Sequence, residues 1–152
     1  MFTEDLIFLD EELRTSTEVL TFSFNQLRRL GYVKEGYLAS ILNREKEFAT
    51  GLMTHAGIHI AMPHTETKYA EKEGVVFIRL KNEVTFQHMV DPDEEVATRL
   101  IFNIVVKNPK NQVIFLTKLM KLFQSEELLN YLLTETDKTN IVKTLQQFVK
   151  KQ

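Results

Sequence analysis

The pair Pro63-His64 is the feature of this sequence best suited to chemistry, because it follows directly on the apolar run Ile58 to Met62. A short apolar run of this kind predicts a β-strand, and proline ends a strand because it has no N–H to donate to the ladder. We therefore expect His64 on a turn at the end of a strand, held by rigid backbone with a ring that reaches solvent. Imidazole exchanges protons near neutral pH and is a good nitrogen nucleophile. Taken alone, such a histidine is more often an ordinary turn residue.

The other three histidines do not complete a metal site. The chain has no pair of histidines four residues apart with a glutamate between, and no cysteine to supply sulfur. If residues 58–62 form a strand, His59 and His64 point to different faces. We therefore expect no metal. We interpret His55 and His88 as surface loop residues and His59 as a packing or supporting residue.

Other kinds of catalytic site lack their motifs. The sequence contains neither Gly-x-Ser-x-Gly nor a glycine-rich phosphate loop, so a serine nucleophile and a nucleotide cofactor have no support. The acidic run at residues 91–95 lacks the ligand pattern of a calcium loop, and we interpret it as a solvated turn.

Arg44 and Thr50 are the polar residues best placed to assist His64. Arg44 is at the polar end of a predicted helix, where on its own it is best read as a partner of Glu47 three residues on. Thr50 and Gly51 lie on the loop that leads toward the strand before His64.

The first half of the chain predicts two helices. Residues 1–14 are ambiguous, with a short apolar run at 6–9 that fits a strand or a helical turn. One helix follows over residues 16–30, with Ser16 or Thr17 as its N-cap and Gly31 at its C-terminal end. A second begins near Glu35 and does not continue far past Gly51.

The second half predicts strands followed by helices. The strands are expected at 58–62, 74–80, a short one at 84–86, and 100–106, the last so continuously apolar that it should be covered on both faces. Helices are expected from about 110, from Ser125 through 133, and from about 137. This pattern implies an α/β layered protein, with strand order and direction left open.

Length and composition favour one domain over residues 1–152. The chain is 43% hydrophobic and 26% charged, as in ordinary globular proteins. A net charge of −2 without a basic block gives no electrostatic support to binding of nucleic acid or an anionic membrane. The acidic first twenty residues do not resemble a signal peptide, and no apolar run approaches the ~20 residues that span a bilayer. With no cysteine, these features fit a cytoplasmic protein.

Two stretches resemble the signature of IIA domains of the bacterial sugar phosphotransferase system, in the mannitol/fructose-type superfamily. They are Asn43 to Gly51 (NREKEFATG) and Ile58 to Glu66 (IHIAMPHTE). The pattern Arg-Glu-x-Glu-Phe-x-Thr-Gly and the later Asn108-Pro109-x-x-Gln112 are most similar to galactitol-type IIA proteins. The resemblance runs from about Ser16 to the last helices. It implies an α/β fold with a central mixed β-sheet flanked by helices on both faces.

The resemblance also implies a function for His64. In this family the histidine after the proline accepts a phosphoryl group from the phosphocarrier protein HPr and passes it to a IIB component, which serves the membrane component IIC. The intermediate is a phosphohistidine, so no cofactor is expected. Phosphoryl transfer passes through a largely dissociative transition state, and the protein therefore contributes mainly positioning and charge stabilisation.

Helper residues follow from the same resemblance. Arg44 matches the family arginine, whose fork of donors suits phosphate oxygens. Thr50 either offers its hydroxyl to the site or caps the turn. Mannitol-type members have a second histidine at the start of the helix after the central strand, where this chain has Lys110-Asn111-Gln112. We expect Gln112 to be the helper, since the galactitol-type pattern also places glutamine there.

Two alternatives remain open. One is a regulatory module of the same fold that binds a partner according to its phosphorylation state, and the other is a binding protein in which His64 is incidental. A phosphoryl carrier must present His64 to two partners in turn, so apolar neighbours should be partly exposed. Met62 and Phe48 are the candidates, and each fits a core position equally well. The identity of the sugar is not expected to be encoded in this chain.

Overall fold

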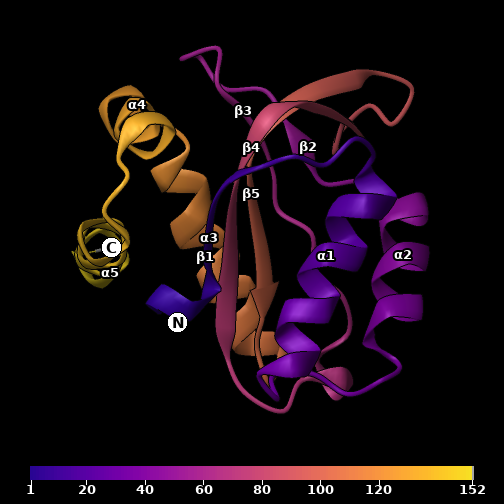
Figure 1. The fold of residues 1–152 in the computed structure, drawn as a ribbon. Coiled ribbons are helices and arrows are strands. Elements are labelled where there is room, and N and C mark those ends of the chain that lie inside the picture. The colour runs from indigo at the N-terminus through magenta and orange to yellow at the C-terminus, as the bar shows by residue number, and fades with distance from the viewer. Residues whose placement is uncertain (152) are drawn as a thin grey trace.

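A five-stranded mixed β-sheet forms the centre of the computed structural model, which describes residues 1–151 (Figure 1). The strand order is β1-β4-β5-β3-β2, with β1 at Ile7–Glu11, β2 at Gly51–Leu52, β3 at His59–Ala61, β4 at Gly74–Gln87 and β5 at Glu95–Val105. The pairs β1/β4 and β3/β5 are parallel, whereas β4/β5 and β2/β3 are antiparallel. The expectation of a mixed sheet is confirmed.

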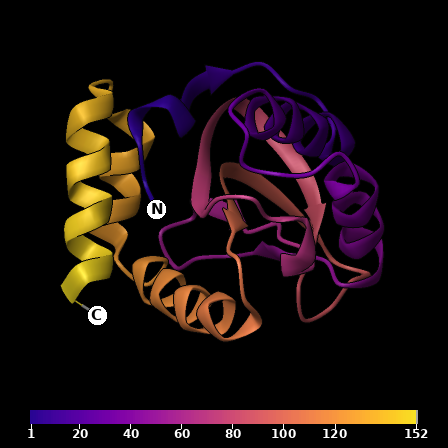
Figure 2. The same ribbon diagram turned by 90° about the horizontal axis from the view of Figure 1, so that it is seen from below.

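Helices cover both faces of this sheet. Helices α1 (Ser16–Arg29) and α2 (Tyr37–Glu47) lie on one face, and α3 (Pro109–Leu122), α4 (Glu126–Thr134) and α5 (Lys138–Lys151) lie on the other (Figures 1 and 2). Short 3-10 turns precede β1 and follow β3, at Glu4–Leu6 and Thr67–Tyr69. Within residues 1–151, none of the helices combines the length and apolar character that crossing a bilayer requires.

Strand β5 shows why two helical layers are needed. Its alternate residues Leu100, Phe102 and Ile104 pack toward α3–α5, whereas Ile101 and Val105 pack toward α1 and α2. Both sets are buried, so the strand is covered on both faces as its continuous apolar sequence predicted.

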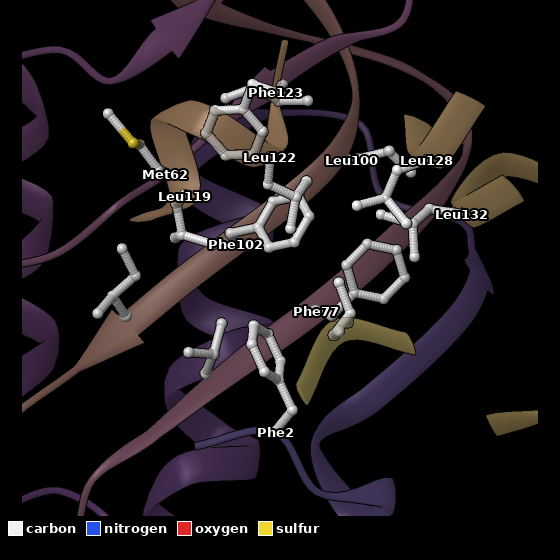
Figure 3. Close-up of a cluster of buried hydrophobic side chains, with 14 of the residues drawn as sticks. Phe2, Met62, Phe77, Leu100, Phe102, Leu119, Leu122, Phe123, Leu128 and Leu132 are labelled. Atoms are coloured by element: carbon white, nitrogen blue, oxygen red, sulfur yellow. The ribbon is translucent and has the colours of Figure 1, made fainter. Parts of the chain in front are cut away.

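The core on the α3–α5 side is rich in aromatic rings (Figure 3). The ring of Phe102 lies with its centroid 5.1 Å from that of Phe77 and 5.2 Å from that of Phe123. Tilted pairs at this separation add to the stabilisation that burial provides. Met62, two residues before His64, belongs to this core and anchors the segment that leads into the turn.

One predicted strand was wrong as a separate element. Residues 84–86 are part of β4, which continues to Gln87 and pairs with β5 on both sides of a register shift between Arg79 and Val84. The polar residues 81–83 are exposed and interrupt the apolar pattern without interrupting the strand. The strand is therefore held by its pairing with β5 on either side of these residues.

The predicted helix ends need small corrections. Thr15, not Ser16 or Thr17, is the N-cap of α1, because its hydroxyl accepts the N–H of Glu18 at 3.1 Å. Gly31 follows the end of α1 with φ 79°, as a C-terminal glycine should. Helix α2 begins at Tyr37, two residues after the predicted start, and the ambiguous first segment forms β1.

Candidate functional site

His64 lies between the two helical layers, just after β3. It lines a hollow of about 490 Å³ to which the end of α2, the middle of α3 and the loop after β4 all contribute. The apolar part of the lining is Phe48, Ala49, Met62, Met89, Pro92, Leu116 and Met120; the polar part is Arg44, Glu47, Thr50 and His64. His64 follows the end of β3, as predicted, but it lies in an irregular segment and is buried, so the prediction of a ring that reaches solvent was wrong.

The backbone fixes which nitrogen of His64 is free to react. Nδ1 lies 2.9 Å from the carbonyl oxygen of Met62. Because a carbonyl can only accept a hydrogen bond, Nδ1 must carry the hydrogen, and the lone pair is on Nε2. The side chain is only 8% exposed, which is less than a surface turn would give. The ring is thus held in one orientation.

Burial also favours the neutral form of this ring. The pKa of His64 is lowered from 6.5, chiefly by burial and further by the positive charge of Arg44, although the hydrogen bond to Met62 acts in the opposite direction. Neutral imidazole is the nucleophilic form. The site therefore favours an unprotonated Nε2 near neutral pH.

Arg44 is held beside His64 with part of its hydrogen-bonding capacity unused. Its guanidinium carbon lies 4.6 Å from the centroid of the Phe48 ring, an arrangement typical of a cation–π contact. Its Nε atom is buried without a hydrogen-bond partner. Within residues 1–151 no ion pair joins Arg44 to Glu47, so that interpretation was wrong. A guanidinium that lines a hollow and has no ion pair within residues 1–151 suits an incoming anion.

Thr50 directs its hydroxyl away from solvent, toward Glu45 on α2. The side chain is 2% exposed, and its hydroxyl lies 2.9 and 3.0 Å from the two carboxylate oxygens of Glu45. The Thr50 N–H donates to the same carboxylate at 2.8 Å. This geometry is that of a residue capping the turn after α2. Burial raises the pKa of Glu45 to about 7, against the opposing effect of the Thr50 hydrogen bonds.

The sequence analysis did not single out Glu45. The available signal was a glutamate in the last turn of a predicted helix, followed by Thr-Gly on the loop. The carbonyl of Thr50 accepts the N–H of Met62 at 3.3 Å. The Glu45–Thr50 contact therefore also holds the backbone just before His64.

Gly51 lets the loop after β4 close over the hollow. A Cβ atom at Gly51 would lie 2.7 Å from the carbonyl oxygen of Gln87, closer than any side chain tolerates. This approach allows the Met89 N–H to donate to the Gly51 carbonyl at 2.8 Å. Met89 thereby becomes part of the wall around His64.

Gln112 lies in an adjoining hollow of about 330 Å³ rather than in the one that His64 lines. It shares this second hollow with Arg44 and Thr65. Its Nε2 donates to the carbonyl oxygen of Thr65 at 3.0 Å, so it fixes the backbone immediately after His64. The Thr65 hydroxyl is also hydrogen-bonded to that of Ser40 on α2.

A buried asparagine supports the turn from beneath. Asn103 of β5 donates from Nδ2 to the carbonyl oxygen of Pro63 at 3.1 Å. The N–H of Ile104 donates to the same oxygen at 3.0 Å. The sequence analysis did not select Asn103, although one polar residue inside the apolar run 100–106 was a visible signal.

The remaining histidines serve their local backbone. His59 accepts the N–H of Thr54 at Nδ1, His88 accepts that of Val90, and His55 is exposed. No three residues of the types His, Cys, Asp and Glu come together as metal ligands in the part of the chain that the structure describes. Of the two apolar neighbours considered for docking, Phe48 is 58% exposed and Met62 is buried.

Comparisons with known proteins identify the family of this chain. Residues 1–148 match the model of the family "Phosphoenolpyruvate-dependent sugar phosphotransferase system, EIIA 2". The chain is 34% identical over 120 residues to the galactitol-specific EIIA component of Escherichia coli K12, covering 78% of this chain and 77% of that protein. It is also 31% identical over 143 residues to the mannitol-specific EIICBA component of the same strain, covering 91% of this chain and 21% of that longer protein.

Solved structures show the same fold. The crystal structure of IIA mannitol from Escherichia coli superimposes with a TM-score of 0.71 at 27% identity, covering 97% of both chains. In the complex of Escherichia coli IIA mannitol with phosphorylated IIB mannitol, the matching chain gives a TM-score of 0.72 at 26% identity, with full coverage of both chains. The chain therefore belongs to the EIIA 2 family of the phosphoenolpyruvate-dependent sugar phosphotransferase system, whose members are phosphotransferases that act as phosphoryl carriers.

Proposed function

We propose that this chain is a single cytoplasmic IIA domain that accepts a phosphoryl group from phospho-HPr on His64 and passes it to a IIB component. The proposal includes uptake of galactitol or a similar carbohydrate, because of the 34% identity to a galactitol-specific EIIA component. The observation that carries it is the hydrogen bond from Nδ1 of His64 to the Met62 carbonyl, which leaves Nε2 as the nucleophile.

The transfer needs no group beyond the two proteins. The lone pair on Nε2 attacks the phosphorus atom of the donor, and the bond from phosphorus to the donor breaks as the new N–P bond forms. Arg44 supports this step because it lines the same hollow as His64 and forms no ion pair within residues 1–151. Its positive charge stabilises the phosphoryl oxygens in the transition state and in the phosphohistidine.

Thr50 and Gln112 contribute by holding the backbone on either side of His64. Thr50 binds the N–H of Met62, and Gln112 binds the carbonyl of Thr65. A phosphoryl transfer that depends on alignment is sensitive to small displacements of the nucleophile. In this proposal neither side chain contacts the phosphoryl group.

The apolar surface around the hollow suits transient docking of protein partners. Phe48 on the α2 side and Met120 on α3 line the hollow and are exposed, and α3 also exposes Val113 and Ile114. A flexible methionine and a flat aromatic ring can adapt to more than one partner surface. The solved complex of the related IIA mannitol with phosphorylated IIB mannitol supports a IIB protein as one of these partners.

A transfer assay tests the proposal against its alternatives. The chain is first phosphorylated with phosphoenolpyruvate, enzyme I and HPr, then separated and mixed with a galactitol-type IIB protein. We expect the phosphoryl group to move to IIB. A chain that is phosphorylated but does not pass the group to any IIB protein would instead be a regulatory module. A chain that is never phosphorylated would be a binding protein.

A further inference from the structure

We propose that Asn103 is a positioning residue for phosphoryl transfer, because it fixes the Pro63–His64 peptide and helix α2 to the same point on β5. This inference rests on the proposed role of His64 as the phosphoryl acceptor. Asn103 lies beneath the site and does not line the hollow around His64. Its effect on the reaction is therefore expected to pass through the backbone.

The environment of Asn103 is unusual for an amide. The side chain is 0% exposed, and its neighbours along β5 from Leu100 to Val106 are apolar and buried. An amide in such a place costs stability unless hydrogen bonds satisfy all of its polar atoms. An aliphatic residue of similar size would fill the same space without that requirement, so packing alone does not explain the amide.

The hydrogen bonds determine how the amide is oriented. The Pro63 carbonyl can only accept, so the atom that faces it at 3.1 Å must be Nδ2. The second hydrogen of Nδ2 is donated to the hydroxyl oxygen of Tyr37 at 2.8 Å. Oδ1 accepts the hydroxyl of Ser23 on α1. The donors and the acceptor of the amide are all used, each toward a different element.

The bond to Pro63 bears directly on His64. The Pro63 carbonyl belongs to the peptide that joins Pro63 to His64, and it is held by two donors, Nδ2 of Asn103 and the N–H of Ile104. The ring is anchored one peptide earlier, on the Met62 carbonyl. If the Pro63–His64 peptide rotated, the ring would lose this anchor and Nε2 would lose its fixed direction.

The hydrogen bond to Tyr37 affects the position of Arg44, because both residues belong to α2. Tyr37 is the first residue of α2, and Arg44 lies two helical turns further along the same helix. Burial raises the pKa of Tyr37, so its hydroxyl stays neutral and available as an acceptor. One amide group thus fixes the position of His64 relative to α2, the helix that contains Arg44.

The experiment compares Asn103→Leu with Ser23→Ala as its matched control. Asn103→Leu keeps the branched shape of the side chain and removes the donor to Pro63, together with the hydrogen bonds to Tyr37 and Ser23. Ser23→Ala removes a buried hydrogen bond to the same asparagine and leaves the Pro63 contact in place. Folding of each variant is checked by thermal unfolding. Should Asn103→Leu not fold, Asn103→Ser replaces it, since its shorter side chain cannot span the distance to Pro63.

Two readouts are needed. The ¹⁵N and ¹H signals of the His64 ring report its tautomer in the unphosphorylated protein. Phosphorylation by phospho-HPr gives kcat and KM. We expect Asn103→Leu to lose the single Nδ1–H tautomer and to lower kcat by about 10- to 100-fold with little change in KM. Ser23→Ala should keep the wild-type tautomer and a kcat within about 3-fold of wild type.

Two results would overturn the proposal. One is a folded Asn103→Leu protein with the wild-type tautomer and kcat. The other is a loss of kcat in Ser23→Ala as large as in Asn103→Leu, which would mean that the asparagine only stabilises the fold. If the wild-type protein accepts no phosphoryl group from active carriers, the proposed function fails instead. The ring signals would still decide whether Asn103 orients His64.

Discussion

Two arginines in this molecule, the buried Arg79 and the partly buried Arg44, have very different surroundings. Arg79 on β4 is 2% exposed and fully engaged: Nε and Nη2 donate to the carboxylate of Asp10 at 2.9 and 3.0 Å, and Nη1 donates to the carbonyls of Leu132 and Glu135. Arg44 stacks on Phe48, and its buried Nε has no hydrogen-bond partner among residues 1–151.

The difference separates a structural arginine from a functional one. Arg79 ties β1 and the end of α4 to the centre of the sheet, and each of its three nitrogens has a partner within the chain. Arg44 keeps an unused donor beside a nucleophilic histidine, which is costly unless a ligand supplies the acceptor. We therefore expect Arg79 to govern stability and Arg44 to govern phosphoryl transfer.

The largest effect is expected from Arg44→Gln. Loss of the guanidinium charge should slow phosphorylation of His64 by about 100- to 1,000-fold, because transition-state charge is then less well stabilised. The thermal unfolding midpoint should shift by no more than about 2 °C, since Arg44 forms no ion pair within residues 1–151. Single-turnover kinetics with phospho-HPr measures the rate. A wild-type rate in this variant would remove Arg44 from the mechanism.

Arg79→Met should show the opposite pattern. The carbonyls of Leu132 and Glu135 would lose their donor, and the free energy of unfolding should fall by about 2 to 4 kcal/mol. Urea denaturation measures this loss. The phosphorylation rate per folded molecule should stay as in wild type. A slower rate in the folded variant would show that the two arginines are not functionally separate.

Glu45→Gln should change how stability depends on pH. Burial raises the pKa of Glu45 from 4.5 to about 7, so between these values the folded state binds a proton that the unfolded state has lost. The free energy of unfolding of the wild type should therefore decrease as pH rises through this window. Glutamine stays neutral and keeps an acceptor for Thr50, so the variant should lose this decrease, a difference on the order of 2 kcal/mol at pH 8.

Urea denaturation at pH 5, 6, 7 and 8 checks this prediction. Glu47→Gln is the matched control, because Glu47 is an exposed carboxylate on the same turn of α2. Parallel pH profiles for wild type and Glu45→Gln would mean that Glu45 is ionised in the folded protein across the whole range.

Gln112→Ala should have the smallest effect. It removes the bond to the Thr65 carbonyl, while the Ser40–Thr65 contact still holds the turn. We expect a fall in kcat of about 3- to 10-fold. Lys110→Ala, a change to an exposed residue at the start of the same helix, is the control. A fall beyond about 100-fold would mean that Gln112 contacts the phosphoryl group itself.

The sequence predicted those parts of the fold that have a periodic signal. The apolar spacing of α1 located that helix closely, and the continuous apolar run located the second half of β5, because burial on one or both faces imposes that pattern. The first part of β5, residues 95–99, was missed because it lacks a continuous apolar run. The single extended β4 was missed because Lys81, Asn82 and Glu83 are polar, whereas pairing with β5 on both sides of them keeps the strand continuous.

The site was only partly predictable, for a physical reason. His64 and Arg44 stand out from their motifs, and both line the hollow. The supporting contacts join residues far apart in the chain, as when Asn103 meets Pro63 and Ser23. Such pairs depend on strand order, which local patterns do not determine. Arg79 likewise had no local signal, since its partners come from β1 and α4.

The most direct test of the central claim is intact mass after incubation with phosphoenolpyruvate, enzyme I and HPr, for wild type, His64→Ala and the control His59→Ala. The account predicts a gain of one acid-labile phosphoryl group in wild type and in His59→Ala, and none in His64→Ala. A phosphoryl group on the His64→Ala protein, or none on wild type with active carriers, would contradict it.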